Sequence, residues 1–144
     1  MSNTALSKTA NREVILVIGD DPFAAGVTAR LLDFAGYRVV LAQDAWPEAE
    51  LASDLVRTVN AVVLNLREPN SDVAAAVGRT RRLSGDAPIV LCTPSPREEI
   101  QTQISNDSSV EILSKPYLFT ELQIAVRKAA RLRHAPSFSR PISP

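Results

Sequence analysis

Histidine and cysteine are almost absent from this sequence, since each occurs once among 144 residues. The single histidine, His134, lies near the carboxyl end, which excludes multi-histidine metal sites and makes histidine-based catalysis a poor fit. The single cysteine, Cys92, lies within an apolar run, where we expect a small buried side chain without a disulfide partner. The chain therefore fits neither a disulfide framework nor a histidine-centred active site.

Net charge is also absent, because 16 basic residues balance 16 acidic ones. Bulk charge therefore favours neither nucleic acid nor a membrane surface, and we expect neither as a partner. No apolar run reaches the length of a membrane span or of a signal-peptide core. With 45% hydrophobic residues, the composition is that of an ordinary globular domain, and we expect a cytoplasmic location.

The two ends of the chain differ in composition from its middle. Residues 1–11 are small and polar without periodicity, and residues 134–144 contain three prolines and three serines. We expect a disordered arm and a disordered tail around one domain that covers residues 12–133.

Short apolar runs rich in valine and isoleucine recur along this domain and predict five strands. The strands are expected at residues 14–18, 38–42, 61–65, 88–92 and 110–113. Helical spacing between and after these runs predicts five helices, which begin near Pro22, Pro47, Asp72, Arg97 and Thr120. The alternation predicts an α/β fold, a doubly wound five-stranded parallel sheet with five flanking helices.

Four polar residues stand where predicted strands end, namely Asp20, Asn65, Thr93 and Lys115. Right-handed crossovers place all these strand ends at one edge of the sheet. Ligands of open α/β sheets bind at that edge, so we expect the site of function there. Asp21, next in the chain, is expected to be the N-cap of the first helix.

The motifs VILVIGDDP, Gly36-Tyr37, VVLNLREP, PIVLCT and SKPY resemble the receiver domain of bacterial two-component response regulators over residues 12–133. The resemblance implies the flavodoxin-like strand order 2-1-3-4-5. It also implies a site in which an aspartate takes a phosphoryl group from a histidine kinase, beside Mg²⁺ held by an acidic pair. In that family a hydroxyl and a lysine bind the phosphoryl oxygens, and an aromatic residue on the fifth strand changes rotamer with the signal.

Two of the acidic positions that the resemblance implies carry other residues. The acidic pair falls on Gly19 and Asp20, so one metal ligand is missing, and the phosphoacceptor falls on Asn65. An amide lacks a comparable nucleophile, because its nitrogen lone pair is delocalised into the carbonyl. Asp20 is the only remaining ligand candidate, so we expect Mg²⁺ binding to be weak or absent and no other cofactor.

At the other positions of the site that the resemblance implies, some residues match the family and others do not. Its hydroxyl and its lysine match Thr93 and Lys115. Pro94 follows Thr93, at a position where the family contacts the phosphoryl group through a backbone N–H that proline lacks. The switch position falls on Ile112, which has no polar tip to report a second state.

Two structural expectations concern the lysine. Receivers usually carry a cis peptide after it, so we expect the Lys115–Pro116 bond to be cis. We also expect the ammonium to lie within reach of Asp20 or of the Asn65 side-chain oxygen, because a buried carboxylate needs a partner.

Together these departures predict a pseudo-receiver, that is, a stand-alone and non-enzymatic receiver in two-component or phosphorelay signalling that is not phosphorylated at Asn65. It is expected to bind a protein such as a histidine kinase or another signalling protein, with a homodimer as a further possibility. The resemblance implies docking through the fourth helix, fifth strand and fifth helix. On the fifth helix we note a basic run, whose charges a solvated helix explains equally well: Arg127, Lys128, Arg131 and Arg133.

Two other functions fit the sequence less well. A flavodoxin-like domain could bind a small anion or nucleotide at the same edge, although GDDP places acids where a phosphate loop needs backbone amides. A working phospho-receiver could use a displaced acid, either Asp21 or Asp72. Asp21 is better explained as a helix cap, and Asp72 is expected in a loop.

Overall fold

The computed structural model describes residues 13–42, 59–69, 72–105 and 107–134, with side chains as far as residue 132. In chain order the elements are β1 (Val14–Gly19), α2 (Pro22–Phe34), β2 (Arg38–Leu41), β3 (Val59–Asn65), α4 (Val73–Ser84), β4 (Ile89–Thr93), α5 (Arg97–Gln103), β5 (Val110–Ser114) and α6 (Phe119–His134). All five predicted strands and four of the five predicted helices lie in these ranges. The helix predicted near Pro47, the arm at 1–11 and the tail after residue 134 lie outside the described residues.

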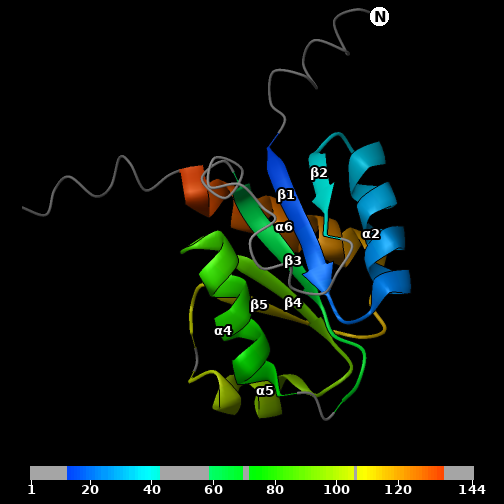
Figure 1. Cartoon of the computed structure of the whole chain (residues 1–144). Helices are drawn as coiled ribbons and strands as arrows, with labels where there is room; N and C mark the ends of the chain where they lie inside the picture. Colours follow the sequence, from blue (N-terminus) through cyan, green and yellow to red (C-terminus); the bar gives the residue numbers. More distant parts are fainter. Residues whose placement is uncertain (1–12, 43–58, 70–71, 106, 135–144) are drawn as a thin grey trace, which may run out of the picture.

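The five strands form one parallel sheet in the order β2-β1-β3-β4-β5, which confirms the predicted doubly wound topology. Figure 1 shows α4 and α5 in front of the sheet and α6 behind it. Side chains of α2 and α6 pack together on one face, whereas those of α4 and α5 pack on the other. Within the described ranges, no helix has both the length and the apolarity needed to cross a membrane.

Successive side chains of each central strand point alternately into two separate cores, one on each face of the sheet. Leu16 and Ile18 of β1 point to the core under α4 and α5. Ile15 and Val17 point to the core under α2 and α6. Because both faces of the sheet are covered, the middle of each central strand is apolar on both faces, and this explains the continuous apolar runs in the sequence.

Local signals set the ends of two helices. Asp21 caps α2, because its Oδ1 accepts a hydrogen bond from the Ala24 backbone N–H at 3.3 Å. Asp72, expected in a loop, is in fact the N-cap of α4 and accepts a bond from the Ala75 N–H at 3.1 Å. Both aspartates therefore stabilise helix starts.

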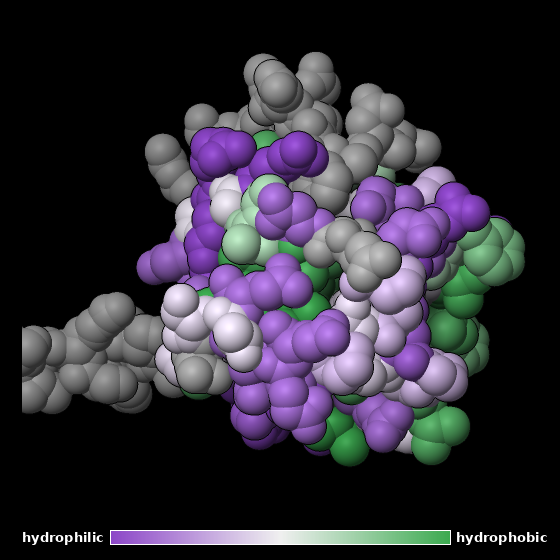
Figure 2. Space-filling model, turned by 90° about the horizontal axis from the view of Figure 1, so that it is seen from below, coloured by the Kyte–Doolittle hydropathy of each residue, from purple (hydrophilic) through white to green (hydrophobic). Residues whose placement is uncertain are grey.

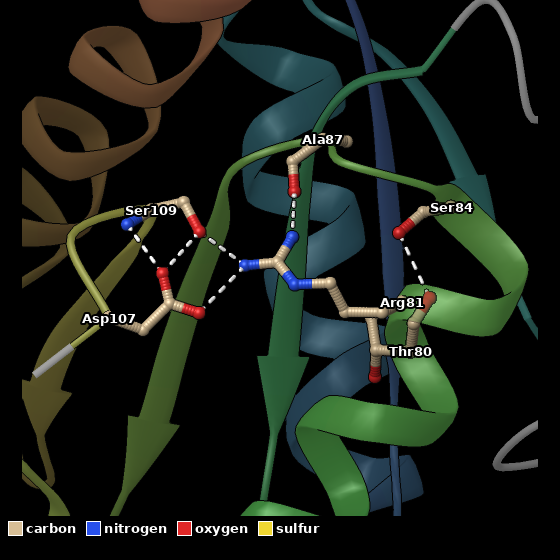
Figure 3. Close-up of polar contacts among 6 residues, drawn as sticks. All are labelled: Thr80, Arg81, Ser84, Ala87, Asp107 and Ser109. Carbon is tan, nitrogen blue, oxygen red and sulfur yellow. Dashed lines mark hydrogen bonds and ion pairs between the residues drawn. The ribbon is translucent and has the colours of Figure 1, made fainter. Parts of the chain in front are cut away.

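Arg81, in the last turn of α4, ties the helix to the starts of two strands (Figure 3). Its guanidinium donates to the Ala87 carbonyl at 3.1 Å and to Asp107 at 3.3 Å, and also contacts the Ser109 hydroxyl. Hydrogen bonds from Ser109, together with the charge of Arg81, lower the pKa of Asp107 despite an opposing effect of burial. This cluster lies where β4 and β5 begin, at the edge opposite the strand ends.

Candidate functional site

The structure brings the strand ends of β1, β3, β4 and β5 to one edge. Gly19 pairs with Asn65 in the sheet register, and the Asp20 N–H donates to the Asn65 carbonyl at 3.1 Å. On the other side, the Lys115 N–H donates to the Thr93 carbonyl at 2.8 Å. Figure 2 views the molecule from this side, where hydrophilic surface predominates near the centre.

Asn65, the last residue of β3, is fully buried with 0% of its surface exposed. Within the described part of the chain, neither its side-chain oxygen nor its side-chain nitrogen has a hydrogen-bond partner. An unpaired buried polar group costs about 1–3 kcal/mol. A neutral amide at this position offers no anionic nucleophile.

Gly19 has a backbone conformation that excludes a side chain. Its φ is +139°, and a Cβ placed there would lie only 2.0 Å from the Asn65 backbone oxygen. The Asn65 nitrogen would be 2.8 Å away. A carboxylate at this position would therefore require the backbones of β1 and β3 to move apart.

Lys115 forms an ion pair with Asp21, not with Asp20 or Asn65, so the predicted partner was wrong. Its Nζ lies 3.0 Å from Asp21 Oδ2 and donates to the Leu66 carbonyl, also at 3.0 Å. Asp21 is available because the cap of α2 uses only its other oxygen, Oδ1.

Asp20 points to a different loop. Its Oδ1 accepts a hydrogen bond at 2.9 Å from the backbone N–H of Arg67, in the loop after β3. One carboxylate oxygen of Asp20 thus holds the β3–α4 loop in place. This explains why its neighbour in the sequence, and not Asp20, became the partner of the lysine.

The Asp21 carboxylate is held in its charged form. Burial alone would raise its pKa, but hydrogen bonds from Lys115 and the Ala24 N–H outweigh that effect. The charges of Lys115 and Arg67 act in the same direction, so the pKa of Asp21 lies below its ordinary value of 3.8. The ion pair is therefore intact at neutral pH.

The Thr93 side chain is hydrogen-bonded within its own loop. Its hydroxyl oxygen accepts from the Ser95 N–H at 3.1 Å, across Pro94, which has no N–H to offer. The Ser95 hydroxyl donates to the Pro69 carbonyl at 2.6 Å, and the Ser114 hydroxyl donates to the Ser95 carbonyl at 3.3 Å. These bonds join the loops that follow β3 and β4 to the end of β5.

Ile112, at the implied switch position, is buried within the core under α4 and α5. Its carbonyl accepts a hydrogen bond from Arg97 at 3.3 Å. The Lys115–Pro116 peptide is cis, as predicted.

Tyr117 lies in the loop after β5, two residues after Lys115, and contacts Cys92 of β4. The Tyr117 hydroxyl makes side-chain hydrogen bonds with Cys92 and Thr28, which ties the loop after β5 to β4 and α2. Burial raises the pKa of the Cys92 thiol to about 11, and burial likewise raises that of Tyr117. The predicted burial of the cysteine is confirmed.

The residues present do not fit a magnesium centre. Mg²⁺ is held by carboxylates together with phosphate oxygens and waters. Gly19 has no side chain to bind a metal, and the Asp21 carboxylate is paired with Lys115. One carboxylate oxygen of Asp20 already accepts the hydrogen bond from the Arg67 N–H in the loop after β3. Over the described ranges, no three His, Cys, Asp or Glu residues gather as a possible metal site.

Sequence reasoning missed two residues of this site. The sequence favours Asp21 as a helix cap over a displaced acid and does not predict its pairing with Lys115, although an aspartate has a second oxygen that can accept another bond. Ser95 was not considered, yet a serine directly after Thr93-Pro94 is a signal for a hydroxyl-capped turn.

Comparisons with known proteins agree with this fold. The chain is 30% identical over 119 residues to the Response regulator MprA of Mycobacterium sp. (strain KMS), covering 81% of this chain and 50% of that protein. It thus spans about half the length of the curated relatives it matches. No protein-family model matches the chain.

Solved structures of similar proteins also have this fold. FixJ-N superposes with a TM-score of 0.67 at 19% identity, covering 84% of this chain and 95% of that one. The receiver domain of the hybrid histidine kinase CckA gives a TM-score of 0.59 at 23% identity, covering 81% and 98%. The chain has the flavodoxin-like receiver fold, and the comparisons support a response regulator receiver domain.

Proposed function

We propose that this chain is a pseudo-receiver of two-component or phosphorelay signalling, which is not phosphorylated at the usual site and acts in the cytoplasm by binding protein. The observation that carries the proposal is Asn65, a neutral and fully buried amide at the carboxyl end of β3. The resemblance places the phosphoacceptor at this position. Acyl phosphate formation needs an anionic carboxylate there.

Three neighbouring features support the same conclusion. Gly19 leaves no room for the second acid, because any side chain would overlap the Asn65 backbone. Pro94 lacks the N–H that the family aims at the phosphoryl group. Lys115 is already paired with Asp21 and bonded to the Leu66 carbonyl.

A displaced phosphoacceptor has little support, because Asp21 and Asp72 each cap a helix. Asp21 also occupies the amino end of α2, where a bound anion would need the free N–H groups. Neither aspartate is thus available as an open nucleophile.

The partner in this proposal is a histidine kinase or another signalling protein. The α5–β5–α6 surface, which the resemblance implies for docking, carries charges that contact one another. Glu111 of β5 lies 3.7 Å from Arg97 and 3.8 Å from Lys128. Exposed pairs of this kind are weak and exchange readily for charges on a partner.

Magnesium titration of the ¹⁵N-labelled chain, followed by amide shifts, tests the proposal. We expect no saturable shifts at Asp20 and Asn65 below about 1 mM, since working Mg²⁺ sites combine carboxylates with phosphate oxygens. Saturable binding below that concentration, centred on these two residues, would mean that the site still operates as a metal-dependent switch.

A further inference from the structure

β2 is an edge strand, and only its side toward β1 is paired. Over the described residues, no other strand pairs with its outer side (Figure 1). The Arg38 N–H donates to the carbonyl of Glu13, just before β1, at 3.0 Å, so Arg38 and, two residues on, Val40 bond toward β1. Because successive residues of a strand bond to opposite sides, the backbone groups of Val39 and Leu41 point outward. Such an edge is a template for another strand.

The other edge strand, β5, is protected by charged side chains. The carbonyl of Ile112, which points away from β4, accepts a hydrogen bond from Arg97 at 3.3 Å. The neighbouring Glu111 lies 3.7 Å from Arg97 and 3.8 Å from Lys128. Charged side chains on an edge strand hinder its pairing with another strand. In β2, by contrast, residues 39–41 are all apolar, so only one edge of the sheet is open to a further strand.

A groove of about 540 Å³ lies beside this open edge, between β2 and α2. Val39 and Leu41 line it from β2, and Phe23 and Gly26 line it from α2. A Cβ added to Gly26 would meet no atom within 4 Å, so the glycine keeps the groove open. Residues opposite each other on paired strands point to the same face, so a strand added to β2 would direct alternate side chains into the groove. Pockets for alternate side chains give strand addition its specificity.

Two arginines border this edge and its groove. Arg38 is exposed at the start of β2, and Arg30 is exposed on α2, where it lines the groove. Neither forms an ion pair within the described ranges. Asp33 also lines the groove, which leaves one positive charge in excess among these three side chains. An acidic residue of a bound segment would therefore find a guanidinium partner here.

We propose that the outer edge of β2 binds an extended segment of a partner protein as a further strand of the sheet. The segment bonds to the outward backbone groups of Val39 and Leu41 and places alternate apolar side chains in the groove. An aspartate or glutamate at its end meets Arg38. The inference rests on the proposed function only in taking this chain to act through a protein partner.

Other occupants fit this edge less well. A helix bonds its own backbone groups, and lipid tails have no polar groups, so neither can pair with a strand edge. A second copy could pair through its own β2, but its Val39 and Leu41 side chains already pack against its own α2–α6 core. They would leave the groove unfilled. An extended partner segment satisfies both the backbone groups and the groove.

A designed peptide of eight residues tests this proposal, with valine and threonine in alternation and glutamate at both ends. It is titrated into the ¹⁵N-labelled full chain. We expect the hydrogen exchange of the Val39 and Leu41 amides to slow at least ten-fold on binding, whereas that of the Val40 amide, which faces β1, stays unchanged.

Two backbone-methylated versions of the peptide are the matched controls. Methyl groups on the valine nitrogens block one edge of the extended peptide, and methyl groups on the threonine nitrogens block the other. One version should bind at least ten-fold more weakly than the parent peptide and the other should bind normally, because only one edge of the peptide faces β2. A version with lysine in place of glutamate should bind more weakly than the parent.

Variants of the chain test the groove. Gly26→Gln should weaken the peptide at least ten-fold by filling the groove, and Gly78→Gln on α4, where an added Cβ also meets no atom within 4 Å, should leave binding unchanged. Both variants favour the helix, because glutamine has the higher helix propensity, so loss of fold does not confuse the result.

Equal binding of the two methylated peptides, unchanged exchange at Val39 and Leu41, or normal binding by Gly26→Gln would overturn the proposal. So would a dimer that forms through β2 without peptide. A phosphorylated chain would overturn the proposed function instead and leave these binding results valid.

Discussion

Lys115 Nζ lies 3.0 Å from Asp21 Oδ2, which joins the loop after β5 to the start of α2. The same ammonium donates to the Leu66 carbonyl, directly after Asn65. In the family that this chain resembles, the lysine binds a phosphoryl group. Here the ammonium is bound to an internal carboxylate and to a backbone carbonyl instead.

Removing the charge of Asp21 should destabilise the fold. Asp21→Asn keeps an N-cap side chain and loses the ion pair, so the free energy of unfolding should fall by roughly 1–3 kcal/mol, the range for a charge-assisted hydrogen bond. In a double-mutant cycle with Lys115→Met, urea unfolding should give a coupling energy of about 1 kcal/mol or more. Additive effects of the two substitutions would show that the contact contributes nothing.

The same pair predicts a pH dependence. Because the pKa of Asp21 is lower in the folded chain than its ordinary 3.8, its contribution is complete above that value. It is lost as the pH falls through the folded pKa. Urea unfolding between pH 6 and pH 3 should therefore show a loss of stability in the wild type that is smaller in Asp21→Asn. Parallel curves for the two proteins would contradict the ion pair.

Gly19→Ala should be severely destabilising, by roughly 1–3 kcal/mol or more, because the Cβ would overlap the Asn65 carbonyl at a φ of +139°. Gly26→Ala, in the middle of α2 with open space around it, should instead stabilise by about 0.5–1 kcal/mol. Thermal unfolding of both variants checks this pair. A tolerated alanine at position 19 would mean that β1 has room for an acid after all.

Arg81→Met should also lower stability, by roughly 1–3 kcal/mol, since it removes the donor to the Ala87 carbonyl and the ion pair with Asp107, which would keep only its bonds from Ser109. Arg82→Met, at an exposed site one residue further along α4, should stay within about 0.5 kcal/mol of the wild type. Arg81→Lys should not restore the loss, because one ammonium cannot copy the guanidinium fork. Equal losses for the two methionine variants would contradict the network in Figure 3.

Asn65→Leu should raise the free energy of unfolding by about 1 kcal/mol, because an unpaired buried amide is replaced by an apolar group of similar size. Chemical denaturation measures this change, and a matched Asn60→Leu substitution should destabilise. The Asn60 side chain accepts a bond from the Val14 N–H at 2.8 Å, which leucine would remove. A large loss for Asn65→Leu would reveal a hydrogen bond at that amide.

The fold was predictable because each of its signals is local. Valine-rich runs become strands apolar on both faces, and Pro22 after Asp21 starts α2. The position of Asn65 at the strand edge followed from topology alone.

The partner of Lys115 was not predictable, because Asp20 and Asp21 are neighbours with the same chemistry. Only the bond from the Arg67 N–H to Asp20 and the orientation of the cap decide between them. The backbone conformation of Gly19 was not predictable either, because a glycine in a sequence does not reveal the sign of its φ.

Intact-mass analysis after treatment with acetyl phosphate and Mg²⁺ tests the central claim most directly. We predict that the wild type keeps its mass. Asn65→Asp should gain little phosphorylation. Gly19 would still offer no carboxylate to Mg²⁺, and Pro94 would still have no N–H for the phosphoryl group. A phosphoryl adduct on the wild-type chain would contradict the pseudo-receiver account.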